Sequence, residues 1–380
     1  YPVLYAYDIF NVKTNMTTYR TAAGDTTAWL YDEATGLLTN KVYADGKGPS
    51  CTYTPDGQLA TRTWARGIVT SYSYDALGQL TRMAYSDATS GGAYAWTRGG
   101  QVASVIVAGV TTNLFAYSDA GLCTNETQNG IAVRRGYDAM GRQVSLAAAG
   151  TSEVLYAYRD DGRMGSVAAA GQAFVYAYAP GLEENAGYSV GAIRKAITLE
   201  PKRDLVTGIT YRQTNGTLIA GRTYAYNEIG NVTRRTRERS GSPEEVDSFG
   251  YDVRSELTDA SLAGTNVFSY AYDSIGNRVT SSELGTSKAY TANNLNQYTS
   301  ISNGTAFVPE FDADGNQTLI KTSTGIWHVT YNGENRPVVW SNGTTVVTMA
   351  FDYMGRRVWK ETVQDGASAR QTFVYDRYLL

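Results

Sequence analysis

Hydrophobic and polar positions alternate in short runs along the whole chain, and each run ends at a turn signal. Tyr72 and Tyr74 lie two residues apart, as do Tyr176 and Tyr178, and this spacing places both rings on one face of an extended strand. Aromatic residues, β-branched residues and Thr fill these runs, which favours a pleated sheet over a helix. Residues 187–203 have no strong apolar face at helical spacing, so we expect an extended chain there as well.

Most runs are followed by Asp-x-x-Gly, as at Asp75 to Gly78. Asp first and Gly fourth are the residue preferences of a type I turn, in which the carboxylate accepts a backbone N–H and Gly takes the left-handed conformation. A second alternating run follows and ends in a second turn. Asn-Gly pairs, a strong hairpin signal, mark four of these second turns: Asn129-Gly130, Asn215-Gly216, Asn303-Gly304 and Asn342-Gly343. The pattern therefore predicts β-hairpins.

The hairpin repeats with a mean spacing of about 21 residues, which gives about 18 units. Each unit is anchored by the residue before its turn: Tyr7, Tyr31, Tyr53, Tyr74, Trp96, Tyr117, Tyr137, Tyr158, Tyr178, Leu199, Tyr226, Tyr251, Tyr272, Tyr290, Phe311, Tyr331, Phe351 and Tyr375. The section 179–225 is degenerate, and Leu199 fits the missing unit. One hairpin cannot bury its own apolar face, so neighbouring hairpins must stack.

These observations predict an all-β fold in which tandem hairpins form one continuous sheet, a β-solenoid. The array is expected to cover residues 1–380 as a single domain, with no separate catalytic domain.

The amino-acid composition of the chain then excludes several classes of function. The chain has 30 Tyr and 39 Gly but one His and two Cys, and its net charge is −3. A single His and two distant Cys cannot form the usual zinc sites, and a near-neutral chain lacks the positive charge of a nucleic-acid binder. The apolar stretch 102–110 is too short to cross a bilayer, and no signal peptide is visible. We therefore expect no metal, no cofactor, no nucleic-acid partner and no transmembrane segment.

The sequence Tyr72-Ser-Tyr-Asp-Ala-Leu-Gly-Gln-Leu-Thr81 returns as Tyr270-Ala-Tyr-Asp-Ser-Ile-Gly-Asn-Arg-Val-Thr280, and it resembles the YD repeat of the RHS (rearrangement hot spot) family. That family includes bacterial polymorphic-toxin carriers, the C component of insecticidal toxin complexes, wall-associated bacterial proteins and the teneurins. The resemblance implies a continuous spiralling sheet that forms a hollow shell or barrel. In the toxin carriers the shell encloses a C-terminal toxin or effector, and in teneurins a similar barrel serves as a cell-surface scaffold.

The resemblance thus implies a structural, non-enzymatic shell segment of a larger secreted or cell-surface protein. Its partner would be an encapsulated C-terminal toxin or effector polypeptide encoded outside this fragment. The toxin carriers cut off this cargo with paired Asp residues in an Asp-Pro-x-Gly type motif. No Asp-Pro dipeptide occurs here, so self-cleavage is assigned to no residue. As an interior piece, the fragment is expected to have uncapped sheet edges near Tyr1 and Leu380 and to self-associate.

The repeated turn Asp residues are the first candidates for chemistry: Asp8, Asp32, Asp75, Asp138, Asp252, Asp273, Asp312, Asp352 and Asp376. They could be catalytic or calcium-binding carboxylates, or they could close turns. Glycosidase chemistry needs two carboxylates in different environments, whereas these recur at one turn position. The segment Asp312-Ala-Asp314-Gly315 comes nearest to a calcium loop but lacks the distal Glu. Turn closure is the interpretation that we favour, and we expect no catalytic residue and no enzyme.

The remaining candidates also have simpler interpretations. His328 lies in an apparent strand without a partner His or Cys, and we expect it to be packed. Cys51 takes the place of an aromatic residue and is expected to be a small buried hydrophobe, while Cys123 lies in no motif. The basic run 234–239 is expected to be a solvated strand and turn.

An alternative function stays open. The exposed aromatic residues could make the chain a cell-surface adhesion or carbohydrate-binding module, whose partner would be a surface glycan or protein.

Overall fold

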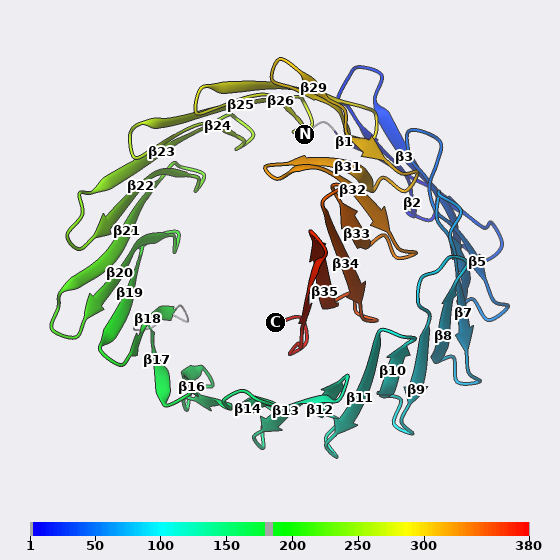
Figure 1. The fold of residues 1–380 in the computed structure, drawn as a ribbon, viewed down its shortest axis with the longest axis horizontal. Helices are drawn as coiled ribbons and strands as arrows, with labels where there is room; N and C mark the ends of the chain where they lie inside the picture. The colour runs from blue at the N-terminus through cyan, green and yellow to red at the C-terminus, as the bar shows by residue number, and fades with distance from the viewer. Residues whose placement is uncertain (1–2, 179–184, 380) are drawn as a thin grey trace. The chain divides into compact units, whose positions relative to one another are not determined.

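The computed structural model describes residues 3–178 and 185–379, and its regular elements are all β-strands, with no helix among the described residues. Residues 179–184 of the degenerate section lie outside the described residues. Hairpins follow one another along the chain (Figure 1). The chain divides into two compact units, Tyr1–Val133 with Asp273–Asn277 and Ala289–Leu380, and Arg134–Tyr272 with Arg278–Lys288. Each unit is described by itself.

The first unit contains two groups of strands. One comprises β1 (Val3–Tyr7), β2 (Lys13–Thr18), β3 (Asp25–Tyr31), β4 (Leu38–Val42), β5 (Ser50–Tyr53), β6 (Leu59–Thr63), β7 (Val69–Tyr74), β8 (Leu80–Tyr85), β9 (Gly92–Trp96), β10 (Val102–Val107), β11 (Thr111–Tyr117) and β12 (Cys123–Gln128). The other comprises β28 (Tyr298–Ser302), β29 (Ala306–Phe307), β30 (Glu310–Phe311), β31 (Gln317–Thr322), β32 (Gly325–Tyr331), β33 (Pro337–Ser341), β34 (Thr345–Phe351), β35 (Arg357–Gln364) and β36 (Ala367–Thr372). Strands β30 to β36 form a sheet of their own, which we call the C-terminal sheet.

The second unit is also built from consecutive β-strands. Its strands are β14 (Gln143–Ala148), β15 (Val154–Tyr158), β16 (Met164–Ala169), β17 (Gln172–Tyr178), β18 (Asn185–Val190), β19 (Ile193–Leu199), β20 (Val206–Gln213), β21 (Leu218–Tyr226), β22 (Val232–Arg239), β23 (Glu245–Tyr251), β24 (Leu257–Leu262), β25 (Asn266–Tyr272) and β26 (Arg278–Glu283). Strands β13 (Ile131–Tyr137) and β27 (Thr286–Ala292) contain residues of both units. The stretch 187–203 contains no helix, as expected: most of it is extended in β18 and β19, and residues 191–192 and 201–203 form turns.

One hairpin shows how the repeat is made. Strand β7 pairs antiparallel with β8, with Tyr72 opposite Met83 and Tyr74 opposite Leu80, and the register shifts between Ser73 and Tyr74. This bulge arises because the turn places one extra residue on the second strand. The same shift precedes the anchor residue in other repeats, for example at Tyr31, Tyr117, Tyr158, Leu199, Tyr226 and Phe351. Leu199 therefore occupies the anchor position of the degenerate unit.

One anchor is placed wrongly by the sequence pattern. In the hairpin of β27 and β28 the shift falls between Thr291 and Ala292, so Ala292 and not Tyr290 is the anchor. Tyr290 lies two residues earlier, on the same face of the strand. The aromatic ring misled the assignment because the anchor itself is Ala, and the turn that follows begins with Asn293 instead of Asp.

The fourth turn position needs a left-handed backbone. Gly78 has φ of 78° there, a conformation that costs Gly little and residues with a Cβ more. In other repeats Asn335 and Ser255 take this position with φ of 57° and 64°. Asn tolerates the conformation through local hydrogen bonding, while Ser is the less favourable choice.

The predicted all-β fold of tandem hairpins is confirmed, because the chain forms long antiparallel hairpin sheets of solenoid type. The expected single continuous sheet is wrong, since β29 and β30 belong to different sheets. The fold is not a closed barrel, which corrects that part of the expectation. The single array over residues 1–380 stays a prediction.

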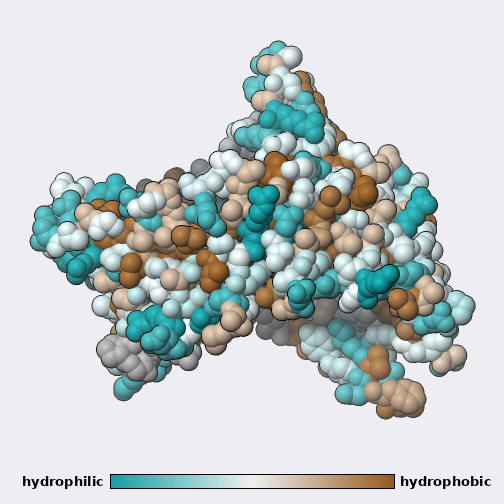
Figure 2. All heavy atoms as spheres, turned by 90° about the horizontal axis from the view of Figure 1, so that it is seen from below, coloured by the Kyte–Doolittle hydropathy of each residue, from teal (hydrophilic) through white to brown (hydrophobic). Residues whose placement is uncertain are grey.

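The hydrophobic core is small. Among the described residues, the buried apolar side chains are Val105, Val107, Val133, Ala260, Phe307, Val329, Ala350 and Val358, and a larger number of buried side chains are polar or charged. Figure 2 shows hydrophobic and hydrophilic residues interspersed over the visible face. A single-layer sheet leaves most side chains partly accessible, so hydrogen bonds must supply much of its specificity.

Candidate functional site

Most of the turn carboxylates accept hydrogen bonds within their own turn. Asp75 Oδ1 accepts the backbone N–H groups of Leu77 and Gln79, both at 2.9 Å. The same pair of bonds recurs at Asp8, Asp138, Asp252, Asp273, Asp312 and Asp352. At Asp138 the backbone N–H of Arg142 is the main reason that the carboxyl pKa lies below its ordinary value. The structure therefore assigns turn closure to these residues.

The anchor hydroxyls join successive repeats. Tyr74 Oη donates to the carbonyl oxygen of Leu59 at 2.9 Å, and Leu59 begins the strand after the preceding turn. Equivalent bonds link Tyr31 to Lys13, Tyr53 to Leu38, Tyr117 to Val102, Tyr158 to Gln143, Tyr178 to Met164, Tyr226 to Val206, Tyr251 to Val232, Tyr272 to Leu257, Tyr331 to Gln317 and Tyr375 to Arg357. The many Tyr residues thus act as cross-links between neighbouring hairpins.

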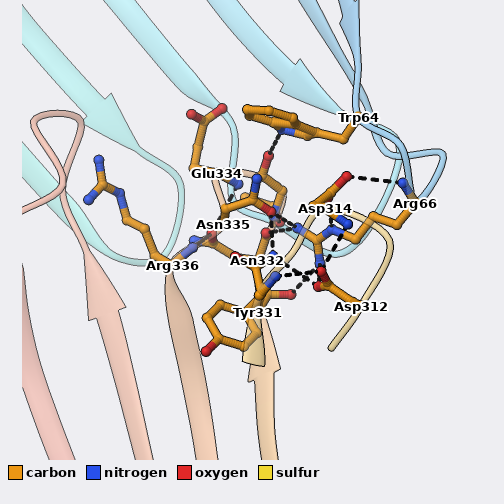
Figure 3. A network of polar contacts seen from close by, with 12 residues as sticks. Trp64, Arg66, Asp312, Asp314, Tyr331, Asn332, Glu334, Asn335 and Arg336 are labelled. Atoms are coloured by element: carbon orange, nitrogen blue, oxygen red, sulfur yellow. Dashed lines mark hydrogen bonds and ion pairs between the residues drawn. The ribbon is translucent and has the colours of Figure 1, made fainter. Parts of the chain in front are cut away.

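Within the first unit, turns of the C-terminal sheet contact residues of the β6 to β12 region, and Arg66 makes the densest of these contacts (Figure 3). Its Nε donates to Asp314 Oδ2 and its Nη1 to the carbonyl oxygen of Tyr331 at 3.1 Å. Its Nη2 donates to the carbonyl oxygen of Asn332 and to Asn335 Oδ1. Asp314 is 1% exposed. We call this cluster the Arg66 clasp.

Neighbouring contacts extend the clasp. Trp64 Nε1 donates to the carbonyl oxygen of Gly333 at 2.7 Å, and the Gly333 N–H donates to Thr89 Oγ1 at 2.6 Å. Glu334 Oε1 accepts Arg62 Nη2 at 2.6 Å. Burial, and then the negative charge of Glu334, raises the pKa of the Tyr85 hydroxyl. Figure 3 shows Glu334 and Trp64 on the same side of the turn that carries Asn332 and Asn335.

A second charged contact lies farther along the same sheet. Arg356 Nη2 donates to Glu126 Oε1 at 2.9 Å and Arg356 Nε to Asp352 Oδ2 at 2.6 Å. All three side chains are at most 5% exposed. Beside them the ring of Tyr353 packs edge-on against Tyr94 and Phe115, with centroids 6.3 Å apart in both cases. Buried charges of this kind are tolerated because they are paired.

Two expectations about the other sequence candidates are wrong. His328 is exposed and not packed, since it points from β32 to the face opposite Trp327 and Val329. Cys51 and Cys123 form no disulfide and are of intermediate burial, so Cys51 is less buried than expected, although burial still raises its pKa. In the described parts of the chain, no three His, Cys, Asp or Glu side chains are grouped to hold a metal ion.

The basic run 234–239 is only partly a solvated strand. Arg234 and Arg239 are exposed, but Arg235 and Arg237 both bind Asp247, whose side chain is 0% exposed. Burial alone would raise the Asp247 pKa, but the hydrogen bonds from Arg237 and Arg235 outweigh it and lower this pKa below its ordinary value. Alternation puts Arg235 and Arg237 on one face, and Asp247 faces Arg235 across the hairpin. That spacing is the signal from which this ion pair could have been predicted.

Comparisons with known proteins agree with this architecture. The RHS Repeat family matches residues 53–90. A crystal structure of TcdB2-TccC3-TEV superposes on 99% of this chain with a TM-score of 0.76 at 14% sequence identity. Residues 53–90 therefore match the RHS repeat, and the chain as a whole is similar in fold to this structure. The TccC3-D651A mutant of the Photorhabdus luminescens Tc holotoxin pore matches 98% of this chain with a TM-score of 0.75 at 15% identity.

The TcdB2-TccC3 crystal structure matches 99% of this chain, with a TM-score of 0.74 at 15% identity. This chain spans about a quarter of these structures, between 24% and 25% of each matched chain. No curated protein sequence matches it. Across the residues that the structure describes, no helix has the length and apolar character needed to span a membrane.

Proposed function

We propose that this RHS-repeat chain is a wall segment of a shell, within a larger secreted or cell-surface protein, that encloses a C-terminal toxin or effector polypeptide and catalyses no reaction. The observation that carries the proposal is the structural match over 99% of the chain to a TcdB2-TccC3 complex. That match extends from the first hairpins to the last, as a wall requires.

The use of the side chains supports the same proposal. The turn carboxylates close their own turns and the anchor hydroxyls link neighbouring hairpins. The repeated polar groups therefore have structural roles. The Arg66 clasp and the Arg356–Glu126 pair fix the C-terminal sheet to earlier strands of the same unit. In such a wall, an enclosed polypeptide is held by exclusion from solvent and not by a catalytic cleft.

Protease protection in the protein made from the complete reading frame tests this proposal. The polypeptide that follows the repeats should resist protease while the repeats are intact, and it should be digested readily when expressed by itself. Equal digestion in both forms, or the absence of any protected polypeptide, contradicts the proposal. Glycan-dependent cell binding that is lost when exposed aromatic residues are replaced would favour the adhesion alternative instead.

A further inference from the structure

A groove with a volume of about 660 Å³, within the range of ligand-binding pockets, lies on one face of the C-terminal sheet. Apolar residues of three consecutive strands form much of its lining: Trp327, Trp340, Val347, Met349 and Phe351. The two Trp rings have centroids 6.4 Å apart and are inclined by 65°, an edge-to-face arrangement. The groove lies apart from Arg66, although Asn335 borders both.

The charge of the groove is positive. Arg336, Arg357 and Lys360 line it, and no carboxylate is among its described lining residues. The whole chain carries a net charge of −3, so three cations without a facing acid are a local departure from the average surface. Cations beside an apolar, partly enclosed floor attract an anionic ligand more strongly than cations in open solvent do.

Two donors in the groove have no acceptor. Trp340 Nε1 and Arg357 Nε are both buried and both lack a hydrogen-bond partner. In contrast, Trp327 Nε1 donates to the hydroxyls of Thr322 and Thr324, both at 3.1 Å. Buried donors without partners are rare, and each one requires an explanation. Both nitrogens are closed to solvent, so a ligand in the groove reaches them only if the side chains around them move.

The groove is elongated along the strands. Its lining runs from the loop at Thr322 and Thr324 to the turn at Asn335 and Arg336, which is the full length of β32. That length is about 20 Å, since a strand rises about 3.3 Å per residue. An extended polypeptide of about six residues spans this distance, and a compact small molecule does not.

We propose that this groove binds an extended, acidic segment of polypeptide that carries an aromatic side chain. The aromatic ring lies against Trp327 and Trp340, and the acidic side chains face Arg336, Arg357 and Lys360. The site rests on these contacts alone and does not depend on the enclosure of a polypeptide by the wall.

Fluorescence polarisation with three labelled six-residue peptides tests the proposal on the intact chain. The first alternates Asp and Glu around one Phe, the second replaces that Phe with Ala, and the third replaces the acids with Lys. We expect the first peptide to bind at least ten-fold more tightly than either of the others, and to quench Trp fluorescence. Equal binding of the acidic and basic peptides, or of the Phe and Ala peptides, would overturn the proposal.

Matched charge reversals separate the groove from general electrostatics. Lys360→Glu reverses a cation in the groove, while Arg370→Glu makes the same change in net charge on the opposite face of the sheet, where Arg370 covers Trp359. We expect Lys360→Glu to weaken the first peptide at least ten-fold and Arg370→Glu less than two-fold. Equal weakening by both variants would contradict a site in the groove. Lys360→Gln, which keeps the side chain neutral, should give an intermediate loss and serves if Lys360→Glu unfolds.

Discussion

The indole N–H of Trp96 donates to the carbonyl oxygen of Leu80 at 2.8 Å. In the neighbouring repeats a Tyr hydroxyl makes this bond, from Tyr74 to Leu59 and from Tyr117 to Val102. The indole N–H of Trp96 therefore makes the same hydrogen bond between hairpins as the Tyr hydroxyls do. This equivalence indicates that Trp and Tyr anchors contribute a hydrogen bond to the preceding hairpin as well as a ring.

Replacing this donor tests the role of the anchor. We expect Trp96→Phe to reduce the free energy of unfolding by about 1 kcal/mol, because the half-buried carbonyl of Leu80 loses its partner. Trp96→Tyr should recover much of this loss, because its hydroxyl takes the place of the indole nitrogen. Urea denaturation measures both variants, and equal stability of Trp96→Phe and Trp96→Tyr would contradict the hydrogen-bonding role.

The Arg66 clasp predicts a local loss of protection. Arg66→Met leaves Asp314 buried without its cation, and breaking a buried pair in this way costs about 3 kcal/mol. Hydrogen exchange should therefore accelerate in β30 to β33, while exchange in β20 to β24 of the other unit stays unchanged. Arg163→Met removes an exposed pair with Asp161 and should alter little. Slow exchange of β30 to β33 in Arg66→Met would show that the clasp does not hold this sheet.

The turn at Ser255 offers a stabilising substitution. Ser255 has φ of 64° at a position that Gly fills in most repeats. Ser255→Gly should raise the free energy of unfolding by about 1 kcal/mol, because the left-handed conformation strains a residue with a Cβ. The reverse change in the same unit, Gly230→Ser, should lower it, since Gly230 has φ of 90°. Thermal melting of both variants measures these changes in stability. A loss of stability in Ser255→Gly would refute this account of the turn.

Asp247 gives the chain a pH dependence whose sign follows from its lowered pKa. A carboxyl with a folded pKa below its unfolded value of about 3.9 stabilises the protein above that pH. This stabilisation is lost as the pH falls through the folded pKa. Asp247→Asn should therefore be less stable at neutral pH and should lose less stability between about pH 4 and pH 2.

Denaturant midpoints measured across this pH range test the assignment. Glu244→Gln, in the exposed turn of the same hairpin, should keep the acid sensitivity of the unmodified chain. An acid transition of the same steepness in Asp247→Asn would mean that other carboxyls govern it.

The repeated features could be predicted from sequence because local chemistry determines them. The Asp75 to Gly78 turn and the alternation of Tyr72 and Tyr74 depend on residues within one hairpin. The contacts of Arg66 with Asp314 and of Arg356 with Glu126 join residues more than 200 positions apart. No pattern within one repeat specifies which distant turn an Arg will meet. Ala292 shows the remaining weakness, because the bulge identifies the anchor where the aromatic ring does not.

A structure of the protein made from the complete reading frame tests the central claim most directly. The account predicts a wall of stacked hairpins over these residues, with a polypeptide enclosed behind it. A wall that encloses no polypeptide, or a region that folds as separate globular domains, would contradict the account.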